Sequence, residues 1–219
     1  MPMLRRKADF RVLSAAELSA WRDVQPAVAG DAMNRSQVMA AAIKPIRTGL
    51  RLCAQARTVE TMVGDNGTVH AALALARPGE VLVVDGRGHV DTAIWGEIMT
   101  RCAIARGLAG VVIDGATRDA AALRELGFAA FVRGTVPRGP HKGFGGTIDG
   151  PVSVGGVAVR PGDLVLGDDD GVTVVPLERL DQVLAEVRKI EARESQMTAA
   201  VAQGKSTAEI NGIALPEVS

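Results

Sequence analysis

The chain has 219 residues, and 25 Lys or Arg balance 25 Asp or Glu, so its formal net charge is zero. Such a length fits a single domain, and a hydrophobic fraction of 47% excludes wholesale disorder. The neutral balance argues against a nucleic-acid partner, and no apolar run approaches the roughly 18 residues of a membrane span.

The N-terminus and the cysteines predict the cellular setting. The first ten residues, MPMLRRKADF, are not followed by an apolar segment, so we expect no secretory signal. Cys53 and Cys102 are too few for a disulfide framework and form no CxxC metal motif. We therefore expect a protein of the reducing cytoplasm.

The first quarter of the chain combines helical and strand patterns. Ser14 opens a capping box, SAAE, that predicts a helix over 14–24, which Pro26 then ends. A second short helical piece is expected to begin at Gly30. Apolar and polar residues alternate over 49–59, which is typical of a half-buried strand.

The middle of the chain alternates apolar helical and strand patterns. Helices are predicted at 68–76, 96–106 and 119–126, and buried strands at 80–85, 110–114 and 129–132. Strands that alternate with helices at this spacing pair in parallel through right-handed crossovers.

The remainder is rich in short β patterns and ends in a helix. Strands are predicted at 152–154, 157–159, 164–166 and 172–175, separated by turns that contain Gly or Pro. The pattern predicts a long amphipathic helix over 177–204 and a tail, 205–219, that docks on a neighbour. The fold class is α/β: one domain over 1–219, with a mixed sheet, helices packed on it and a helical extension at 1–29.

Most of the chemistry lies between Trp95 and Asp119. Glu97 falls in the first turn of a predicted helix, Asp114 ends a predicted strand, and Arg118 and Asp119 lie in the loop beyond it. Ligands of open α/β sheets bind beyond the carboxyl ends of the strands, so we expect these four side chains on one rim.

This rim suits a small 2-oxo acid. The free N–H groups of 96–99 favour a carboxylate, and Gly96 allows a close approach to the backbone. Asp119 can hold a hard divalent cation, and Arg118 can bind an oxygen that becomes negative. A cation and a guanidinium on one oxygen stabilise an enolate, which a carbon–carbon lyase needs. No lysine falls in 95–119 to form a Schiff base.

Structural roles remain alternatives for several residues. Glu97 can be a residue favoured by the helix dipole, Asp119 a plain N-cap, and Arg118 a solvated loop charge. A structural role is preferred for Asp114. The basic, Gly-rich loop 138–146 either binds a substrate's distal carboxylate or is a flexible surface connection.

Four further candidates favour a structural interpretation. His70 is expected to be a packed or surface histidine, and so is His89, which is placed in a Gly-rich turn. The run 168–171, DDDG, is expected to be a tight turn rather than a metal loop. Cys102 is expected in the core.

Seven ordered sequence blocks carry a family resemblance. They are DAMNR (31–35), GDNGTVHAAL (64–73), PGEVLVVDGRG (78–88), WGEIM (95–99), RGLAGVVIDGATRD (106–119), GGVAVRPGDLVLGDDDGVTVVP (155–176) and EARE (191–194). From about Gly30 to Gly204 the chain resembles the 4-hydroxy-4-methyl-2-oxoglutarate/4-carboxy-4-hydroxy-2-oxoadipate aldolases and the related regulator of ribonuclease E activity A.

The resemblance implies a swivelling β/β/α fold and a trimer, or a hexamer made from trimers, with active sites between subunits. It implies that Asp119 helps to hold Mg²⁺ or Mn²⁺ and that Arg118 binds the keto oxygen. The backbone amides of Gly96, Glu97, Ile98 and Met99 would hold the 2-oxo carboxylate. The Glu97 side chain would hold water on the metal and relay protons, and Glu194 of a neighbouring subunit, or else Glu191, would complete the metal shell.

The activity implied is that of a class II aldolase. It would cleave a 4-hydroxy-2-oxo di- or tricarboxylic acid to pyruvate and an oxo acid, and would decarboxylate oxaloacetate through the same enolate. The alternatives are a non-catalytic regulator that binds ribonuclease E, and a related lyase or hydratase acting on another 2-oxo acid. The resemblance favours an enzyme, because the regulator branch tends to lack an acidic residue at the position of Glu97.

Overall fold

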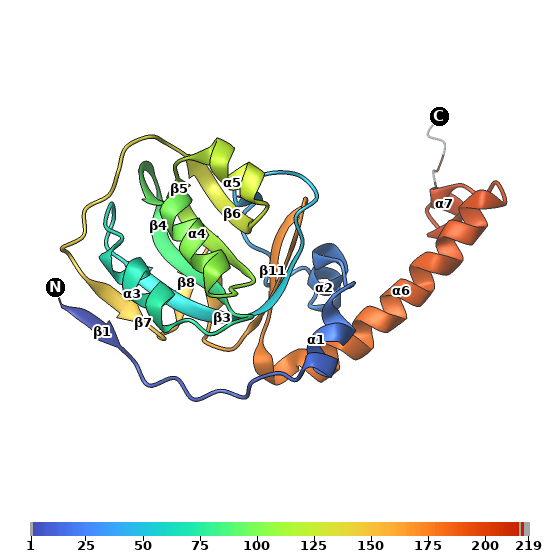
Figure 1. The fold of residues 1–219 in the computed structure, drawn as a ribbon. Coiled ribbons are helices and arrows are strands. Elements are labelled where there is room, and N and C mark those ends of the chain that lie inside the picture. The colour runs from blue at the N-terminus through green and yellow to red at the C-terminus, as the bar shows by residue number, and fades with distance from the viewer. Residues whose placement is uncertain (1, 215, 217–219) are drawn as a thin grey trace.

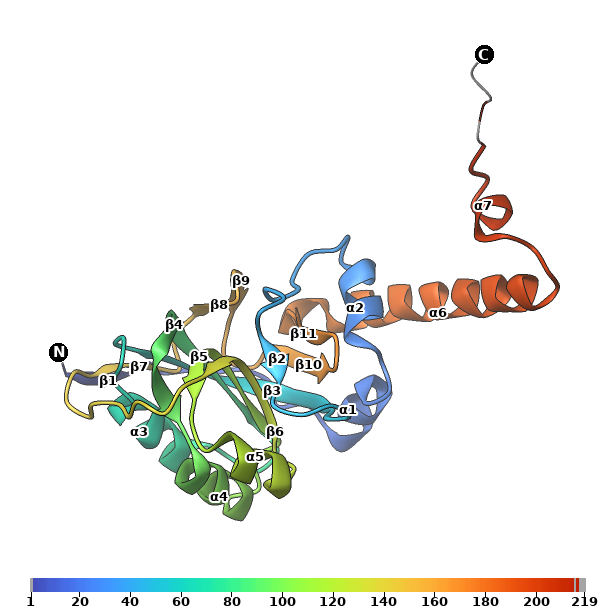
Figure 2. The same ribbon diagram turned by 90° about the horizontal axis from the view of Figure 1, so that it is seen from above.

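The computed structural model describes residues 2–214 and 216. Its centre is a nine-stranded mixed sheet (Figures 1 and 2). Seven strands follow the order β1-β7-β3-β4-β5-β6-β2; of the other two, β10 pairs with β3 and β11 pairs with β10. These strands are β1 (Met3–Arg5), β2 (Lys44–Pro45), β3 (Leu52–Thr61), β4 (Val81–Trp95), β5 (Gly110–Thr117), β6 (Ala129–Thr135), β7 (Gly146–Ile148), β10 (Leu164–Asp168) and β11 (Gly171–Val175). The mixed α/β fold is as predicted, and β3, β4, β5 and β6 pair in parallel as expected.

Both faces of the sheet are covered. Helices α3 (Gly67–Leu75), α4 (Glu97–Ala105) and α5 (Ala120–Leu126) lie on one face, and the hairpin of β8 (Val152–Val154) and β9 (Val157–Val159) lies over the other (Figure 2). Along β4, Leu82 and Val84 pack into the helical core while Val81 and Val83 pack into the opposite one. The strands that lead to the rim beyond β4 and β5 are therefore packed on both faces.

The predicted half-buried strand at 49–59 is wrong in its burial and its bounds. The strand is β3, which begins at Leu52, and most of its residues are buried on both faces. The alternation is misleading because Gln55 and Arg57 are buried polar residues: the Gln55 amide bonds to Arg11 and Gly162 carbonyls. Gln55 and Arg57 can therefore lie in the interior, because their polar groups are hydrogen-bonded there.

The N-terminal segment contains two short helices, α1 and α2. Helix α1 (Ala15–Trp21) has the predicted capping box, in which Ser14 and Glu17 bond reciprocally. The prediction that Pro26 ends a helix and Gly30 begins the next is wrong, because Pro26 is the first residue of α2 (Pro26–Ala32). Proline is favoured there because its missing N–H has no helical partner to lose.

A long helix leads away from the sheet. After a 3₁₀ turn at Leu177–Arg179, α6 (Leu180–Ala202) packs its first half against α1 and α2, and its second half projects from the body (Figures 1 and 2). The predicted tail contains a short helix, α7 (Thr207–Ile210). Within the described part of the chain, every helix is too short or too polar to cross a membrane.

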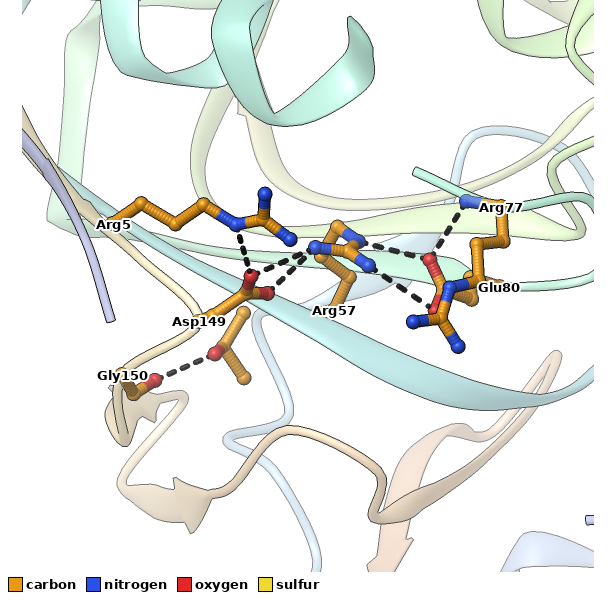
Figure 3. A network of polar contacts seen from close by, with 7 residues as sticks. Arg5, Arg57, Arg77, Glu80, Asp149 and Gly150 are labelled. Carbon is orange, nitrogen blue, oxygen red and sulfur yellow. Dashed lines mark hydrogen bonds and ion pairs between the residues drawn. The ribbon is translucent and has the colours of Figure 1, made fainter. Parts of the chain in front are cut away.

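A buried ion network ties the N-terminal strand to the sheet (Figure 3). Arg57 of β3 donates from Nη1 to both oxygens of Asp149, at 2.7 and 2.9 Å, and from Nε to Glu80 Oε2 at 2.9 Å. Arg5 of β1 donates to Asp149 Oδ2 at 3.1 Å. The Arg57 side chain is 3% exposed, so its charge is compensated by these carboxylates rather than by water.

Candidate functional site

The register of β4 and β5 builds the candidate site. Trp95 ends β4 and pairs with Thr117, which ends β5. The next residues of both strands therefore meet at one rim, and the Arg118 N–H donates to the Trp95 carbonyl at 3.1 Å. As predicted, the start of α4 and the Arg118-Asp119 pair lie side by side.

Asp119 is directed towards α4 rather than towards its own helix. It has a left-handed backbone, with φ of 58°, and its side chain makes no capping bond to α5. Its Oδ2 instead accepts a hydrogen bond from the Glu97 N–H at 3.0 Å and lies 3.5 Å from Arg118 Nε. Asp119 therefore occupies the N-cap position of α5 by its backbone, as the structural alternative predicts, but its side chain binds the start of α4 instead of capping α5. A strained backbone at such a position is typical of functional sites.

Gly96 makes this approach possible. A Cβ atom at Gly96 would lie 2.7 Å from Asp119 Oδ2 and 3.2 Å from Arg118 Cγ. Its φ of −174° is ordinary extended backbone, so space alone requires the glycine. The predicted role of Gly96 is thus refined, because the group that comes close to its backbone is the Arg118-Asp119 pair itself.

The N-terminus of α4 presents backbone donors. The Glu97 N–H is occupied by Asp119, whereas the N–H groups of Ile98 and Met99 find no acceptor among the described residues. Ile98 is 79% exposed, so this first turn opens to solvent. Of the predicted amide donors, those of Ile98 and Met99 are therefore free to bind an anion, and that of Glu97 is committed to Asp119.

The Glu97 side chain pairs with its own helix. Its Oε1 accepts from Arg101 Nε at 2.8 Å, one helical turn further along. Within the described residues, no contact joins its carboxylate to Arg118 or Asp119. Both members of the Glu97–Arg101 pair are substantially exposed, so the pair is weak and the carboxylate is free to reorient.

Two hollows meet at the Arg118-Asp119 pair. The first, of about 150 Å³, is lined by the start of α4 and by residues of α3 and the loop after β6. Its lining residues are Asn66, His70, Trp95, Gly96, Glu97, Ile98, Met99, Arg118, Asp119, Pro140 and Lys142. The second, of about 330 Å³, lies between Arg118-Asp119-Ala120 and Thr135-Val136-Pro137. Their small size suits a small-molecule ligand.

Among the residues that line the first hollow, Asn66, His70 and Lys142 bring polar groups that the sequence did not place there. Lys142 reaches it from the Gly-rich loop, although its position in the chain placed it apart from the reactive segment. His70 lines the same wall, and partial burial, together with the charge of Lys142, lowers its pKa below the usual value. Asn66 is 4% exposed, and its buried Oδ1 has no donor among the described residues.

The loop 138–146 is anchored and is not a free surface connection. His141 N–H donates to the Gly64 carbonyl at 2.8 Å, and Asn66 N–H donates to the His141 carbonyl at 3.0 Å. Both oxygens of Asp65 are also hydrogen-bonded, to Gly67 and to the loop. The signal available in the sequence was the GDNG block at 64–67, which supplies these partners.

Asp114 and Cys102 do not lie where the sequence predicts. Asp114 is not on the rim, since β5 continues to Thr117, but its structural role is confirmed: it binds Arg133 Nε and the Gly155 N–H. Cys102 is exposed on α4 and is not in the core.

The two remaining structural candidates lie outside the site. His89 lies inside the long strand β4, not in a turn, and its ring contacts Thr92. The run 168–171 is the predicted tight turn between β10 and β11.

The residues present fit a divalent cation only in part. Within the described chain, no group of three His, Cys, Asp or Glu side chains is arranged to hold a metal ion. Asp119 supplies one half-exposed carboxylate at the hollow. Mg²⁺ is often held by one or two carboxylates, with water and substrate oxygens in the other positions. The donor set fits such a cation if its other ligands come from outside this chain.

The first hollow has no lining residue from α6. Glu194 belongs to the second half of α6 by its position in Leu180–Ala202, and that half projects from the body (Figure 2). It therefore does not contribute to the site of its own chain. Glu191 is paired with Arg188 at 2.7 Å, whereas Glu194 makes no ion pair with a described residue. Delivery of Glu194 to a neighbouring subunit stays a prediction.

The family follows from comparison with known proteins. The RraA-like model, described as Aldolase/RraA, matches residues 26–174. The chain belongs to this family. A Halalkalibacterium halodurans relative named "Putative 4-hydroxy-4-methyl-2-oxoglutarate aldolase" is 37% identical over 192 residues, which are 86% of this chain and 91% of the relative.

Solved RraA-like structures share the fold. Streptomyces coelicolor RraAS2, described as an unusual member of the RNase ES inhibitor RraA protein family, superimposes with a TM-score of 0.76 at 29% identity, covering 85% of this chain and 98% of its own. An uncharacterized protein from Pseudomonas syringae pv. tomato gives a TM-score of 0.81 at 24% identity, covering 92% and 100%. The proteins that this chain resembles thus include one named as a putative aldolase and one described as a member of an RNase inhibitor family.

Proposed function

We propose that this RraA-like protein is a divalent-metal-dependent aldolase that cleaves a 4-hydroxy-2-oxo acid with a second carboxylate, such as 4-hydroxy-4-methyl-2-oxoglutarate, to pyruvate and an oxo acid. The observation that carries the proposal is the convergence of Arg118, Asp119 and the free amides of Ile98 and Met99 on one small hollow. A guanidinium, a carboxylate and anion-binding amides are the groups that a 2-oxo acid and its enolate require.

Binding orients the substrate across the hollow. The 1-carboxylate accepts hydrogen bonds from the Ile98 and Met99 amides at the positive end of α4. The 2-oxo oxygen then faces the Arg118 guanidinium, which stabilises negative charge as it develops. A divalent cation held by Asp119 would act as a Lewis acid on the same oxygen.

Cleavage follows from a proton transfer. Glu97, through a water molecule, takes the proton of the 4-hydroxyl, and C4 becomes a carbonyl carbon as the C3–C4 bond breaks. The electron pair of that bond moves into the C2–C3 bond, and the 2-oxygen becomes the enolate oxygen beside Arg118. Return of the proton to C3 gives pyruvate. Loss of carbon dioxide from oxaloacetate yields the same enolate, so we expect that side activity.

The second carboxylate of the substrate lies towards Lys142. Besides Arg118, Lys142 is the permanently charged cation among the residues that line the first hollow, and it comes from the loop after β6. This placement supports the distal-carboxylate role considered for the loop 138–146. It also makes Lys142 the lysine to test for a Schiff base; we expect borohydride treatment with pyruvate to leave it unmodified.

Assembly completes the site in this proposal. Glu194 from a neighbouring subunit supplies a further carboxylate near Asp119, in a trimer or in a hexamer made from trimers. The projecting half of α6 supports this, because it places Glu194 beyond the body of its own chain (Figure 2).

Coupling to lactate dehydrogenase tests the activity. With Mg²⁺ or Mn²⁺, the protein should form pyruvate from 4-hydroxy-4-methyl-2-oxoglutarate and from oxaloacetate, and EDTA should abolish both reactions. Arg118→Ala should lower kcat/KM by about 100-fold or more while the protein stays folded. The absence of turnover with either metal would contradict the proposal.

A regulatory role is the second candidate, favoured by the inhibitor names of RraA-like structures. Under that alternative, the purified protein would bind ribonuclease E and form no pyruvate. A third outcome, turnover of another 2-oxo acid by hydration or cleavage, would keep the site and change the substrate.

A further inference from the structure

Asp65 is a buried carboxylate that the proposed reaction does not use. It is 0% exposed, and its Oδ2 accepts hydrogen bonds from the backbone N–H groups of Gly143 at 2.6 Å and Phe144 at 3.1 Å. Its Oδ1 accepts the Gly67 N–H at the start of α3, at 2.9 Å. Three N–H donors compensate the buried charge, which would otherwise be very costly.

These bonds fix the backbone on both sides of Lys142. Gly143 and Phe144 are held by Asp65, while His141 is held by its paired bonds to Gly64 and Asn66. The Lys142 backbone also packs on α3: a Cβ atom at Gly67 would lie 3.4 Å from the Lys142 carbonyl carbon. The backbone that carries Lys142 is therefore fixed, while the exposed ammonium group of its side chain remains able to bind a ligand.

We propose that Asp65 is a positioning residue that sets the preference for substrates with a second carboxylate, because it holds the loop that carries Lys142 to the first hollow. This inference rests on the proposed function. Asp65 and Lys142 together recognise the second carboxylate of the substrate, whereas Arg118 and Asp119 act on its 2-oxo group. Without the Asp65 bonds, the Lys142 side chain samples many positions. Ordering it on binding then costs conformational entropy, which weakens the binding of the substrate.

Two substrates of the same shape separate these roles. In 4-hydroxy-4-methyl-2-oxopentanoate, a methyl group replaces the second carboxylate of 4-hydroxy-4-methyl-2-oxoglutarate, and cleavage gives pyruvate and acetone. The wild-type chain and the D65N, K142M and D65N/K142M variants are compared on both substrates. D65N keeps the size of the side chain and one of its acceptor oxygens but cannot accept all three N–H bonds.

We expect D65N and K142M each to raise KM for the dicarboxylate about tenfold, the worth of one charged hydrogen bond. We expect kcat/KM for the methyl analogue to stay within about twofold, and the double variant to resemble either single variant because both act through one contact.

The other outcomes would contradict the role of Asp65, the role of Lys142 or the proposed function. Equal losses on both substrates in D65N, or additive losses in the double variant, would make Asp65 merely structural. K142M changes an exposed side chain and should fold even where D65N does not, so an unchanged dicarboxylate KM in K142M is sufficient to overturn the inference. If the wild-type chain cleaves neither substrate, the proposed function fails and this inference fails with it.

Discussion

Asp119 Oδ2 accepts the Glu97 N–H at 3.0 Å, so the residue that precedes α5 is fastened to the first residue of α4. This bond keeps a carboxylate beside Arg118 and sets it at the open end of a helix. The two segments lie 22 positions apart in sequence and meet because β4 and β5 are parallel neighbours.

Gly96→Ala should disrupt this arrangement without unfolding the protein. The new Cβ would lie 2.7 Å from Asp119 Oδ2, and the half-exposed carboxylate can move away at little cost in stability. We expect kcat/KM for pyruvate formation to fall about 100-fold, because small displacements of reacting groups have effects of that size. The melting temperature serves as the control: a large drop would mean that the backbone, not Asp119, had moved.

The sequence was sufficient to predict the α/β order and the Glu97–Arg118–Asp119 grouping, because these depend on local periodicity and on the edge that parallel strands share. It was insufficient for β1 and β7, which are three-residue strands held by pairing rather than by an apolar pattern. It offered the basic loop 138–146 as a carboxylate-binding candidate, but it could not place Lys142 at the first hollow, because that placement depends on the long-range bonds of Asp65 to a loop without periodicity.

Arg57→Met should destabilise the protein strongly. It leaves the buried carboxylates of Glu80 and Asp149 without their shared cation, and we expect a loss of about 3–5 kcal/mol in the free energy of unfolding, measured with urea. Arg5→Ala is the matched control, since Arg5 binds the same Asp149 but is 55% exposed. Its cost should stay below about 1 kcal/mol. Equal effects of the two changes would refute this reading of the network.

His70 should titrate below its usual range. Burial, together with the positive charge of Lys142, lowers its pKa from 6.5, so the folded state keeps it neutral where the unfolded chain already binds a proton. The free energy of unfolding therefore begins to fall as the pH drops below 6.5, the value of the unfolded chain, and it continues to fall until the pH has passed the lower pKa of the folded state. NMR titration of the His70 ring should give a midpoint below 6.5, and K142M should move it part of the way back. A midpoint unaffected by K142M would place Lys142 away from His70.

The two cysteines should react at very different rates. Burial raises the pKa of the Cys53 thiol to about 11, whereas Cys102 is exposed on α4. Thiolate is the reactive form, so iodoacetamide at about pH 8 should modify Cys102 first. Mass spectrometry with a C102S control checks this: C102S should retain only the slow site, and fast labelling of C102S would contradict the burial of Cys53.

The central claim is that Arg118 and Asp119 act on the 2-oxo group itself. Exchange of the pyruvate methyl protons with deuterium oxide, followed by proton NMR, measures enolate formation without cleavage or a second carboxylate. The wild-type protein with Mg²⁺ or Mn²⁺ should catalyse the exchange, and D119N and Arg118→Ala should each lower its rate by about 100-fold while remaining folded. Exchange that proceeds at the wild-type rate in both variants, or that is absent from the folded wild-type protein with either metal, would contradict the account.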